Sequence, residues 1–226
     1  MLAGGPGIRL KPLTDKTPKA LVDVHGKPLI QWVLEWLRMN GVSRVVLGVA
    51  HLKEEIIDYL GDGSSFGIDI TYSTHTVEGG TGEGFRLAIN RYVNEDVFFA
   101  MNGDQITDLK LKDLADFHLQ HSPVATIAMT NPHCPYGHIK FDEQNNVVEF
   151  VEKPFCPHAN CSAGVYVFKK EILNFLPSKG DVERTTFPLL ATRKNLKVYP
   201  FNGIFITVNT NKDLIEAEEK LKVIYG

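Results

Sequence analysis

The sequence predicts an α/β protein with a three-layer α/β/α, Rossmann-like fold around a mixed, mostly parallel central sheet. Short β-branched runs alternate with longer segments of helical periodicity, an order typical of parallel strands joined by helices. The run Val97–Met101 is wholly apolar, as strands covered on both faces are. A chain of 226 residues, 43% hydrophobic and 23% charged, has ordinary soluble composition, and its length suits one large α/β domain or two small ones.

The helices and strands of the first half follow from apolar spacing and from residues that start or stop helices. Pro28 opens a helix whose apolar stripe includes Trp32 and Trp36, and Gly41 stops it. The expected helices are Pro28–Asn40, Lys53–Leu60, Gly82–Tyr92 and Leu111–His121. The expected strands are Val45–Val49, Ile68–Tyr72, Val97–Met101 and Val124–Thr130.

The second half departs from this alternation. The polar turn Asp142–Asn146 lies between His138–Phe141 and Val147–Glu152 and predicts a hairpin. Further strands are expected at Ala163–Phe168, Leu196–Phe201 and Ile204–Val208, followed by a last helix at Thr210–Tyr225.

Charge and composition exclude several classes of partner. A net charge of −3 gives no general attraction to nucleic acid or to an anionic membrane. No apolar run reaches the length of a membrane span, and the N-terminus lacks the pattern of a secretory signal. Because Cys134, Cys156 and Cys161 cannot all pair with one another, reduced thiols in a cytoplasmic protein are the simpler expectation.

The segment Gly4-Gly5-Pro6-Gly7 is a candidate phosphate-binding loop. Three glycines in four positions let backbone N–H groups approach anionic oxygens, and Arg9, Lys11 and Lys19 add cations. It is not a P-loop, because no Gly-Lys-Ser/Thr follows at the required offset. The alternative is a flexible surface turn with solvated charges. Pro18 stiffens the chain before Lys19 and favours a site for a small anion.

Five sequence blocks together resemble a known family, the sugar-1-phosphate nucleotidylyltransferases, over almost the whole chain. They are Leu2-Ala3-Gly4-Gly5-x-Gly7-x-Arg9-Leu10 with Pro18-Lys19, Gly26-Lys27-Pro28-Leu29-Ile30, Asn102-Gly103-Asp104, Val151-Glu152-Lys153-Pro154 and Ala163-Gly164-Val165-Tyr166. The resemblance implies a nucleotidyltransferase fold and an enzyme that joins a nucleoside triphosphate to a sugar 1-phosphate and releases pyrophosphate. We read one domain, residues 1–226, in which residues 1 to about 130 bind nucleotide and the rest bind sugar phosphate.

Asp104 is the predicted metal ligand. It lies just past the strand Val97–Met101, where ligands of open α/β sheets bind, and Asp108 would complete an acidic pair. Mg²⁺ needs only one or two carboxylates beside substrate phosphates. The alternative is that Asp104 merely caps a turn. By resemblance, Asp104 holds a catalytic Mg²⁺, and Arg9 and Lys19 act with it.

The resemblance also assigns residues to the two substrates. The nucleotide-binding positions are Leu2, Ala3, Gly4, Gly5, Gly7, Gly80, Thr81 and Gly82, where a helix begins whose amino terminus would favour an anion. The sugar-phosphate-binding positions are Glu152, Lys153, Ser162 and Gly164. From the residues alone, an exposed strand-end ion pair is the favoured interpretation of Glu152 and Lys153, and Gly164 also fits close packing in a strand.

Two features depart from the family pattern. Thr207 stands where many members have a second metal-binding aspartate, and Asn209, two residues on along the same strand face, offers an amide oxygen instead. Met1 directly precedes Leu2, whereas members usually begin with more of a central strand. We expect either that neighbouring strands compensate or that the natural chain starts upstream.

Three functions stay open from the sequence. The first is the transferase, in which the sugar phosphate is already an anion and needs no general base. The second is an inactive homologue that binds nucleotide-sugar and regulates a partner, and the third transfers a nucleotide to a non-sugar phosphate such as phosphocholine. The base, the sugar and assembly as a homodimer are not fixed.

Two groups of metal-ligand residue types are not interpreted as metal sites. His118 and His121 are expected at the surface of their helix. The remaining candidates for a zinc site are His133, Cys134, Cys156, His158 and Cys161. Their spacing fits no familiar zinc finger or ribbon, so we interpret them as residues of proline-rich turns.

Overall fold

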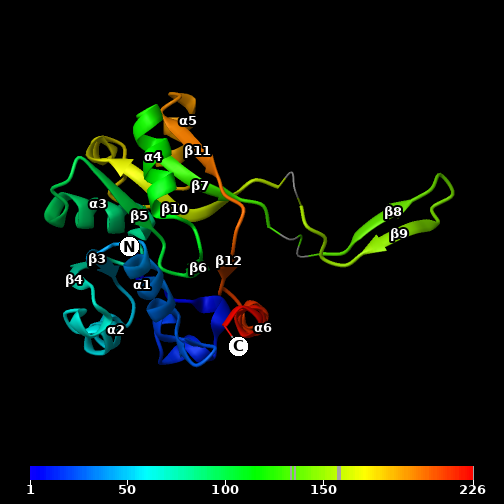
Figure 1. Ribbon diagram of the computed structural model, residues 1–226, viewed down its shortest axis with the longest axis horizontal. Helices are drawn as coiled ribbons and strands as arrows, with labels where there is room; N and C mark the ends of the chain where they lie inside the picture. The colour runs from blue at the N-terminus through cyan, green and yellow to red at the C-terminus, as the bar shows by residue number, and fades with distance from the viewer. Residues whose placement is uncertain (133, 135, 157–158, 226) are drawn as a thin grey trace.

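The computed structural model describes residues 1–132, 134, 136–156 and 159–225, and its elements alternate as predicted (Figure 1). The helices are α1 (Leu29–Met39), α2 (Lys53–Leu60), α3 (Gly80–Tyr92), α4 (Leu111–His121), α5 (Thr186–Thr192) and α6 (Asn211–Tyr225). The strands are β1 (Asp23–Val24), β2 (Lys27–Pro28), β3 (Arg44–Val49), β4 (Asp69–Thr74), β5 (Val97–Met101), β6 (Gln105–Thr107), β7 (Ala125–Thr130), β8 (His138–Phe141), β9 (Val147–Val151), β10 (Cys161–Lys169), β11 (Leu196–Pro200) and β12 (Phe205–Thr207). The helices and strands expected from the sequence are found; α5 and the strands β1, β2 and β6 were not predicted.

The central sheet is mixed and mostly parallel, as predicted. β3 pairs in parallel with β4, and β7 with β11, whereas β10 runs antiparallel to both β5 and β7. Leu2 joins the pair β3–β4 to the group of β5, β7, β10 and β11 through parallel bridges to Gly48 and Asn102. Its N–H donates to the Met101 carbonyl at 2.9 Å, and its carbonyl accepts from the Gly103 N–H at 2.7 Å. Leu2 thus occupies the central strand position, and both neighbouring strands pair with it.

Helices cover both faces of this sheet. Successive side chains of a strand point to opposite faces. On β10, Val165 and Val167 pack in the core formed with α1, α2 and α4, whereas Tyr166 and Phe168 pack with α3 and α5. The three-layer arrangement is therefore confirmed. Among the described helices, none combines the length and apolar content that crossing a membrane requires.

A smaller core holds the N-terminal loop against the end of the chain. Leu10 and Trp32 pack there with Ile206 of β12 and Leu221 of α6. Figure 1 shows α6 beside the N-terminal segment. This contact places residues near position 209 close to the glycine-rich loop.

The hairpin β8–β9 extends away from the rest of the chain (Figure 1). Its turn is built by Asp142, whose carboxylate accepts from the N–H groups of Gln144 at 3.0 Å and Asn146 at 2.8 Å. The side chains of both strands are exposed, including Phe141 and Phe150. The hairpin therefore depends on its base for support, since an isolated two-stranded hairpin is marginally stable.

His118 is buried, so the prediction of a surface histidine was wrong. Its Nδ1 lies 2.8 Å from the Thr126 hydroxyl on β7, because α4 packs this turn against the sheet. Burial lowers the pKa of His118 to about 4, and the nearby Lys169 ammonium adds to the effect. The folded protein therefore keeps this imidazole neutral.

We expect His118→Gln to flatten the pH dependence of stability. Because the folded pKa lies below the ordinary value of 6.5, stability is complete above that value and is lost as pH falls toward about 4. The free energy of unfolding attributable to this group should drop by at most about 2 kcal/mol between pH 7 and pH 5. Urea unfolding of both proteins at the two pH values measures the difference, and equal losses would contradict it.

Candidate functional site

A pocket of about 650 Å³ lies at the carboxyl ends of the central strands. It is lined by residues 2–9, Lys19, Ala20, His75, Val77, Gly80, Thr81, Asn102, Gly103, Asp104, Asp181 and Asn209. Most of the predicted catalytic, metal-binding and nucleotide-binding positions are in this set. The volume falls in the range of pockets that bind small molecules.

The Lys19 ammonium lies between two predicted metal ligands. Its Nζ donates to Asp104 Oδ2 at 2.7 Å and to Asn209 Oδ1 at 2.8 Å. The Lys19 side chain is only 13% exposed, so this charge has few water contacts and depends on these partners. Three residues far apart in the sequence therefore meet at one positive charge.

Asn209 is held by the start of α6. The N–H groups of Asn209 and Thr210 donate to Asp213 Oδ2 at 3.1 and 3.0 Å, and the Asp213 N–H donates to Thr210 Oγ1 at 3.1 Å. This is the reciprocal pattern of a capping box. Asn209 therefore lies in the loop past β12. Its spacing from Thr207 predicted a place on the same strand face, and that prediction was wrong.

The glycine-rich loop has a defined shape. Gly7 adopts a left-handed conformation, with φ of 60°, which places its carbonyl where the Thr14 hydroxyl donates to it at 2.9 Å. Leu10, fully buried, anchors the next turn. A Cβ at Gly7 would lie 3.1 Å from the Lys19 Cβ, so this glycine allows the loop to pack directly against the lysine.

His75 is a pocket residue that sequence reasoning missed. Its ring packs under the loop, since a Cβ at Gly4 would lie 2.8 Å from two ring atoms. Burial lowers the pKa of His75, and the Glu83 carboxylate offsets part of the effect. The ring is therefore kept neutral near pH 7. Its place directly after β4, at the carboxyl end of a strand, was the signal available in the sequence.

Asp181 is a second missed residue, and it reaches the pocket through contact between two loops. Thr81 donates from its N–H to Asp181 Oδ1 at 3.3 Å and from its hydroxyl to Glu183 at 2.8 Å. The Gly82 N–H donates to the Gly180 carbonyl at 2.9 Å. Gly80 and Thr81 line the pocket, but Gly82 does not, and the first N–H groups of α3 are already bound within the protein. They are therefore not free for the anion that we expected there.

Comparison with known proteins identifies the family. The nucleotidyl transferase family matches residues 1–222. The chain belongs to this family. The resemblance to sugar-1-phosphate nucleotidylyltransferases is thereby confirmed.

Individual relatives agree with this assignment. The chain is 35% identical over 225 residues to mannose-1-phosphate guanyltransferase of Kluyveromyces lactis, covering 96% of this chain and 62% of that protein. The catalytic subunit beta of mannose-1-phosphate guanylyltransferase of Dictyostelium discoideum is also 35% identical, with 96% and 62% covered. The chain thus spans about three fifths of the length of these curated relatives. HddC from Yersinia pseudotuberculosis, complexed with GMP-PN, matches with a TM-score of 0.77 at 26% identity, over 97% of both chains.

The four predicted sugar-phosphate residues of this chain lie outside the pocket lining. The Lys153 ammonium pairs with Glu216 of α6, which raises the pKa of Lys153 and lowers that of Glu216. The Ser162 hydroxyl accepts from the Gly164 N–H at 3.2 Å, and the Gly164 carbonyl accepts from the Asn102 N–H at 2.9 Å. Gly164 therefore fixes the backbone of Asn102, which lines the pocket.

Two further sequence predictions concern carboxylates. Glu152 follows β9 at the base of the exposed hairpin and does not line the pocket. The acidic pair of Asp104 and Asp108 is not formed around the pocket either. The Asp108 carboxylate instead accepts from the Ile204 N–H at 2.7 Å, which fixes the chain entering β12.

We expect Gly80→Ala to destabilise the contact between the start of α3 and the loop at Gly180 and Asp181. Gly80 has a φ of 65°, and a Cβ there would lie 2.5 Å from Asp181 Oδ1. Strain and displacement should lower the free energy of unfolding by on the order of 1–3 kcal/mol. Gly5→Ala is the matched control: nothing lies within 4 Å of its Cβ, and its stability should match the wild type. Denaturant unfolding measures both, and equal stability of the two variants would refute the loop contact.

Proposed function

We propose that this chain transfers a guanylyl group from GTP to a sugar 1-phosphate and releases pyrophosphate. The observation that carries the proposal is the meeting of Lys19, Asp104 and Asn209 in the pocket that also contains Arg9 and the glycine-rich loop. The choice of guanine rests on the relatives, named mannose-1-phosphate guanyltransferases, and on the GMP-PN complex of HddC. Mannose 1-phosphate is accordingly the first acceptor to test.

The residues of the pocket suit substitution at the α-phosphorus. A phosphate oxygen of the sugar 1-phosphate forms the new P–O bond, and the bond to the β-phosphate oxygen breaks as pyrophosphate leaves. The nucleophile is already an anion near pH 7, so no residue has to remove a proton. The glycine-loop amides, Arg9 and Lys19 position the phosphates and neutralise their charge, which is where phosphoryl-transfer proteins contribute most.

Asp104 and Asn209 would hold a divalent cation, which we propose to be Mg²⁺. Their side-chain oxygens converge on Lys19 Nζ, and in this proposal the ammonium moves toward the phosphates when the ion binds. One carboxylate and one amide oxygen beside substrate phosphates form a ligand set that Mg²⁺ accepts. When bound, the ion would neutralise phosphate charge and polarise the reacting phosphoryl group. Thr207 does not line the pocket, so its hydroxyl is not needed as a ligand.

The second half of the chain contributes to both substrates in this proposal. Asp181 and Asn209 line the pocket from residues beyond position 130, so the two predicted halves share one site. We propose that Lys153 and Glu152 contact the sugar phosphate beside the base of the hairpin, with Ser162 and Gly164 shaping that side. Since the substrates are soluble phosphates, the proposal places the reaction in the cytoplasm.

A pyrophosphate-release assay tests the activity. We expect turnover with Mg²⁺, GTP and mannose 1-phosphate, and lower rates with UTP, dTTP and CTP. Glucose 1-phosphate and phosphocholine serve as alternative acceptors. Binding of GDP-mannose without turnover on every pair would refute the transferase and support a regulatory binding protein.

Replacing Lys19 or Asp104 should remove most of the activity. Lys19→Ala deletes a cation that neutralises the phosphates, and Asp104→Ala deletes the carboxylate proposed to hold Mg²⁺, so kcat should fall by roughly 10²-fold or more in each. Lys16→Ala is the matched control, because Lys16 is exposed on the same loop and does not line the pocket. Steady-state kinetics measure all three, with circular dichroism to confirm folding. Near-normal kcat in Asp104→Ala would remove this residue from the metal site.

A further inference from the structure

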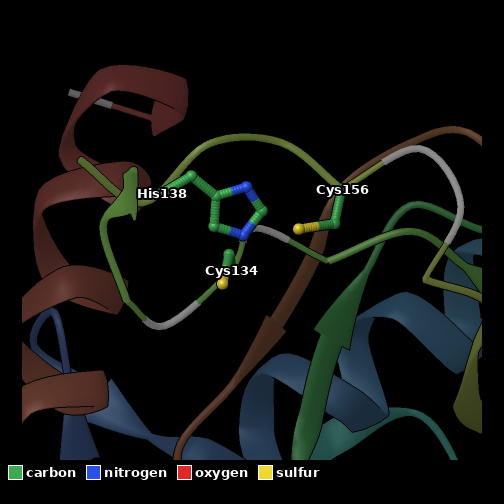
Figure 2. Close-up of side chains that lie close together, drawn as sticks. All are labelled: Cys134, His138 and Cys156. Carbon is green, nitrogen blue, oxygen red and sulfur yellow. The ribbon is translucent and has the colours of Figure 1, made fainter. Parts of the chain in front are cut away.

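Three metal-ligand side chains gather at the base of the hairpin β8–β9. Cys134 lies between β7 and β8, His138 is the first residue of β8, and Cys156 follows β9. One ligand atom from each residue lies within 4.8 Å of the others. Figure 2 shows the imidazole of His138 with both sulfur atoms beside it. Among the described histidine, cysteine, aspartate and glutamate side chains, these three form a group that could hold one metal ion.

Backbone hydrogen bonds bring these residues together. The Cys134 N–H donates to the Pro154 carbonyl at 2.8 Å, and the Cys156 N–H donates to the Pro132 carbonyl at 3.1 Å. The chain entering the hairpin and the chain leaving it therefore run side by side at this point. Twenty-two positions separate the two cysteines in the numbering, from 134 to 156, which explains why their spacing resembles no local zinc motif.

The chemistry of this set selects one class of cation. Thiolate sulfur and imidazole nitrogen suit zinc, whereas Mg²⁺ and Ca²⁺ take oxygen ligands. In a tetrahedral site with bonds of about 2.0–2.3 Å, ligand atoms lie roughly 3.3–3.8 Å apart. The three ligand atoms all lie within 4.8 Å of one another, so they need to close by at most roughly 1.5 Å, which side-chain rotation supplies. Cys134 and Cys156 are partly exposed and His138 is exposed, so all three can rotate and a solvated ion can enter.

We propose that Cys134, His138 and Cys156 bind one zinc ion, with water in the fourth position. On binding, both thiols release their protons to solvent and the imidazole donates a lone pair while neutral. None of the three residues lines the pocket that contains Asp104, so the zinc site is separate from the proposed Mg²⁺ site.

The ion would tie the chain entering the hairpin to the chain leaving it. The hairpin side chains are exposed, so its strands gain little from burial, and a metal link between entry and exit supplies what packing does not. Cys161, on β10 opposite Thr130, is outside the cluster and serves as a control of the same chemical type. His133 and His158, named with these cysteines from the sequence, lie outside the described residues.

The test is the metal content of the full chain, which does not depend on the proposed transferase activity. Protein purified with a reductant and incubated with zinc, then freed of unbound metal, should retain one zinc ion per chain by elemental mass spectrometry. Replacement by cobalt should give the visible bands of a tetrahedral site and a thiolate charge-transfer band. Cys134→Ser and Cys156→Ser should each weaken zinc binding by roughly tenfold or more. Cys161→Ser and His121→Ala should bind zinc as the wild type does.

Hydrogen exchange provides a second measurement that is insensitive to total yield. Amides of residues 138–151 should exchange more slowly after zinc is added to the wild type, and show no change in Cys156→Ser. The proposal is overturned if the reduced wild type retains no zinc, if both cysteine variants retain it, or if Cys161→Ser loses it equally. A disulfide between Cys134 and Cys156 in metal-free protein, found by peptide mass spectrometry, would also overturn it.

Discussion

The pocket depends on the contacts of one ammonium group. Lys19 Nζ holds Asp104 at 2.7 Å and Asn209 at 2.8 Å, and so ties together the N-terminal loop, the end of β5 and the start of α6. A largely buried charge is costly without partners, so these three segments are held at fixed separation. Each partner is also fixed independently. Asp104 follows β5, whose last two residues, Ala100 and Met101, are buried, and Asn209 precedes a helix cap formed by Thr210 and Asp213.

Sheet topology explains why the ligands can meet. Leu2 joins β3 to β5, so the segments that leave Leu2 and these two strands emerge side by side. The N-terminal loop, His75 and Asp104 all follow strand ends at this edge. Glycines at these exits allow close approach: a Cβ at Gly103 would lie 2.9 Å from the Leu2 carbonyl. Loops at the carboxyl edge of a sheet can therefore build a phosphate site while the strands below supply stability.

Local properties could be predicted from the sequence. Properties that depend on contacts between distant segments could not. Apolar periodicity located the helices and strands because burial imposes that spacing on them. Arg9, Lys19 and Asp104, which line the pocket, could be proposed as site residues from the sequence because they belong to short sequence blocks. His75 and Asp181 could not, since their place in the pocket results from packing under Gly4 and from docking of the segment at Gly180 on that at Gly79. Burial of His118 and the clustering of Cys134 with Cys156 likewise result from packing that no spacing rule encodes.

The base of the hairpin and the pocket are joined by α6. Lys153, three residues before Cys156, pairs with Glu216 of α6, and the first turn of the same helix caps the loop that carries Asn209. A line of contacts transmits coupling only if one of its members has two alternative arrangements. If the proposed function is correct, Lys153 has two such arrangements. Its ammonium pairs either with Glu216 or with a sugar phosphate, because it cannot bind both fully. Loss of the Glu216 contact on substrate binding would then act on the helix that positions Asn209 against Lys19.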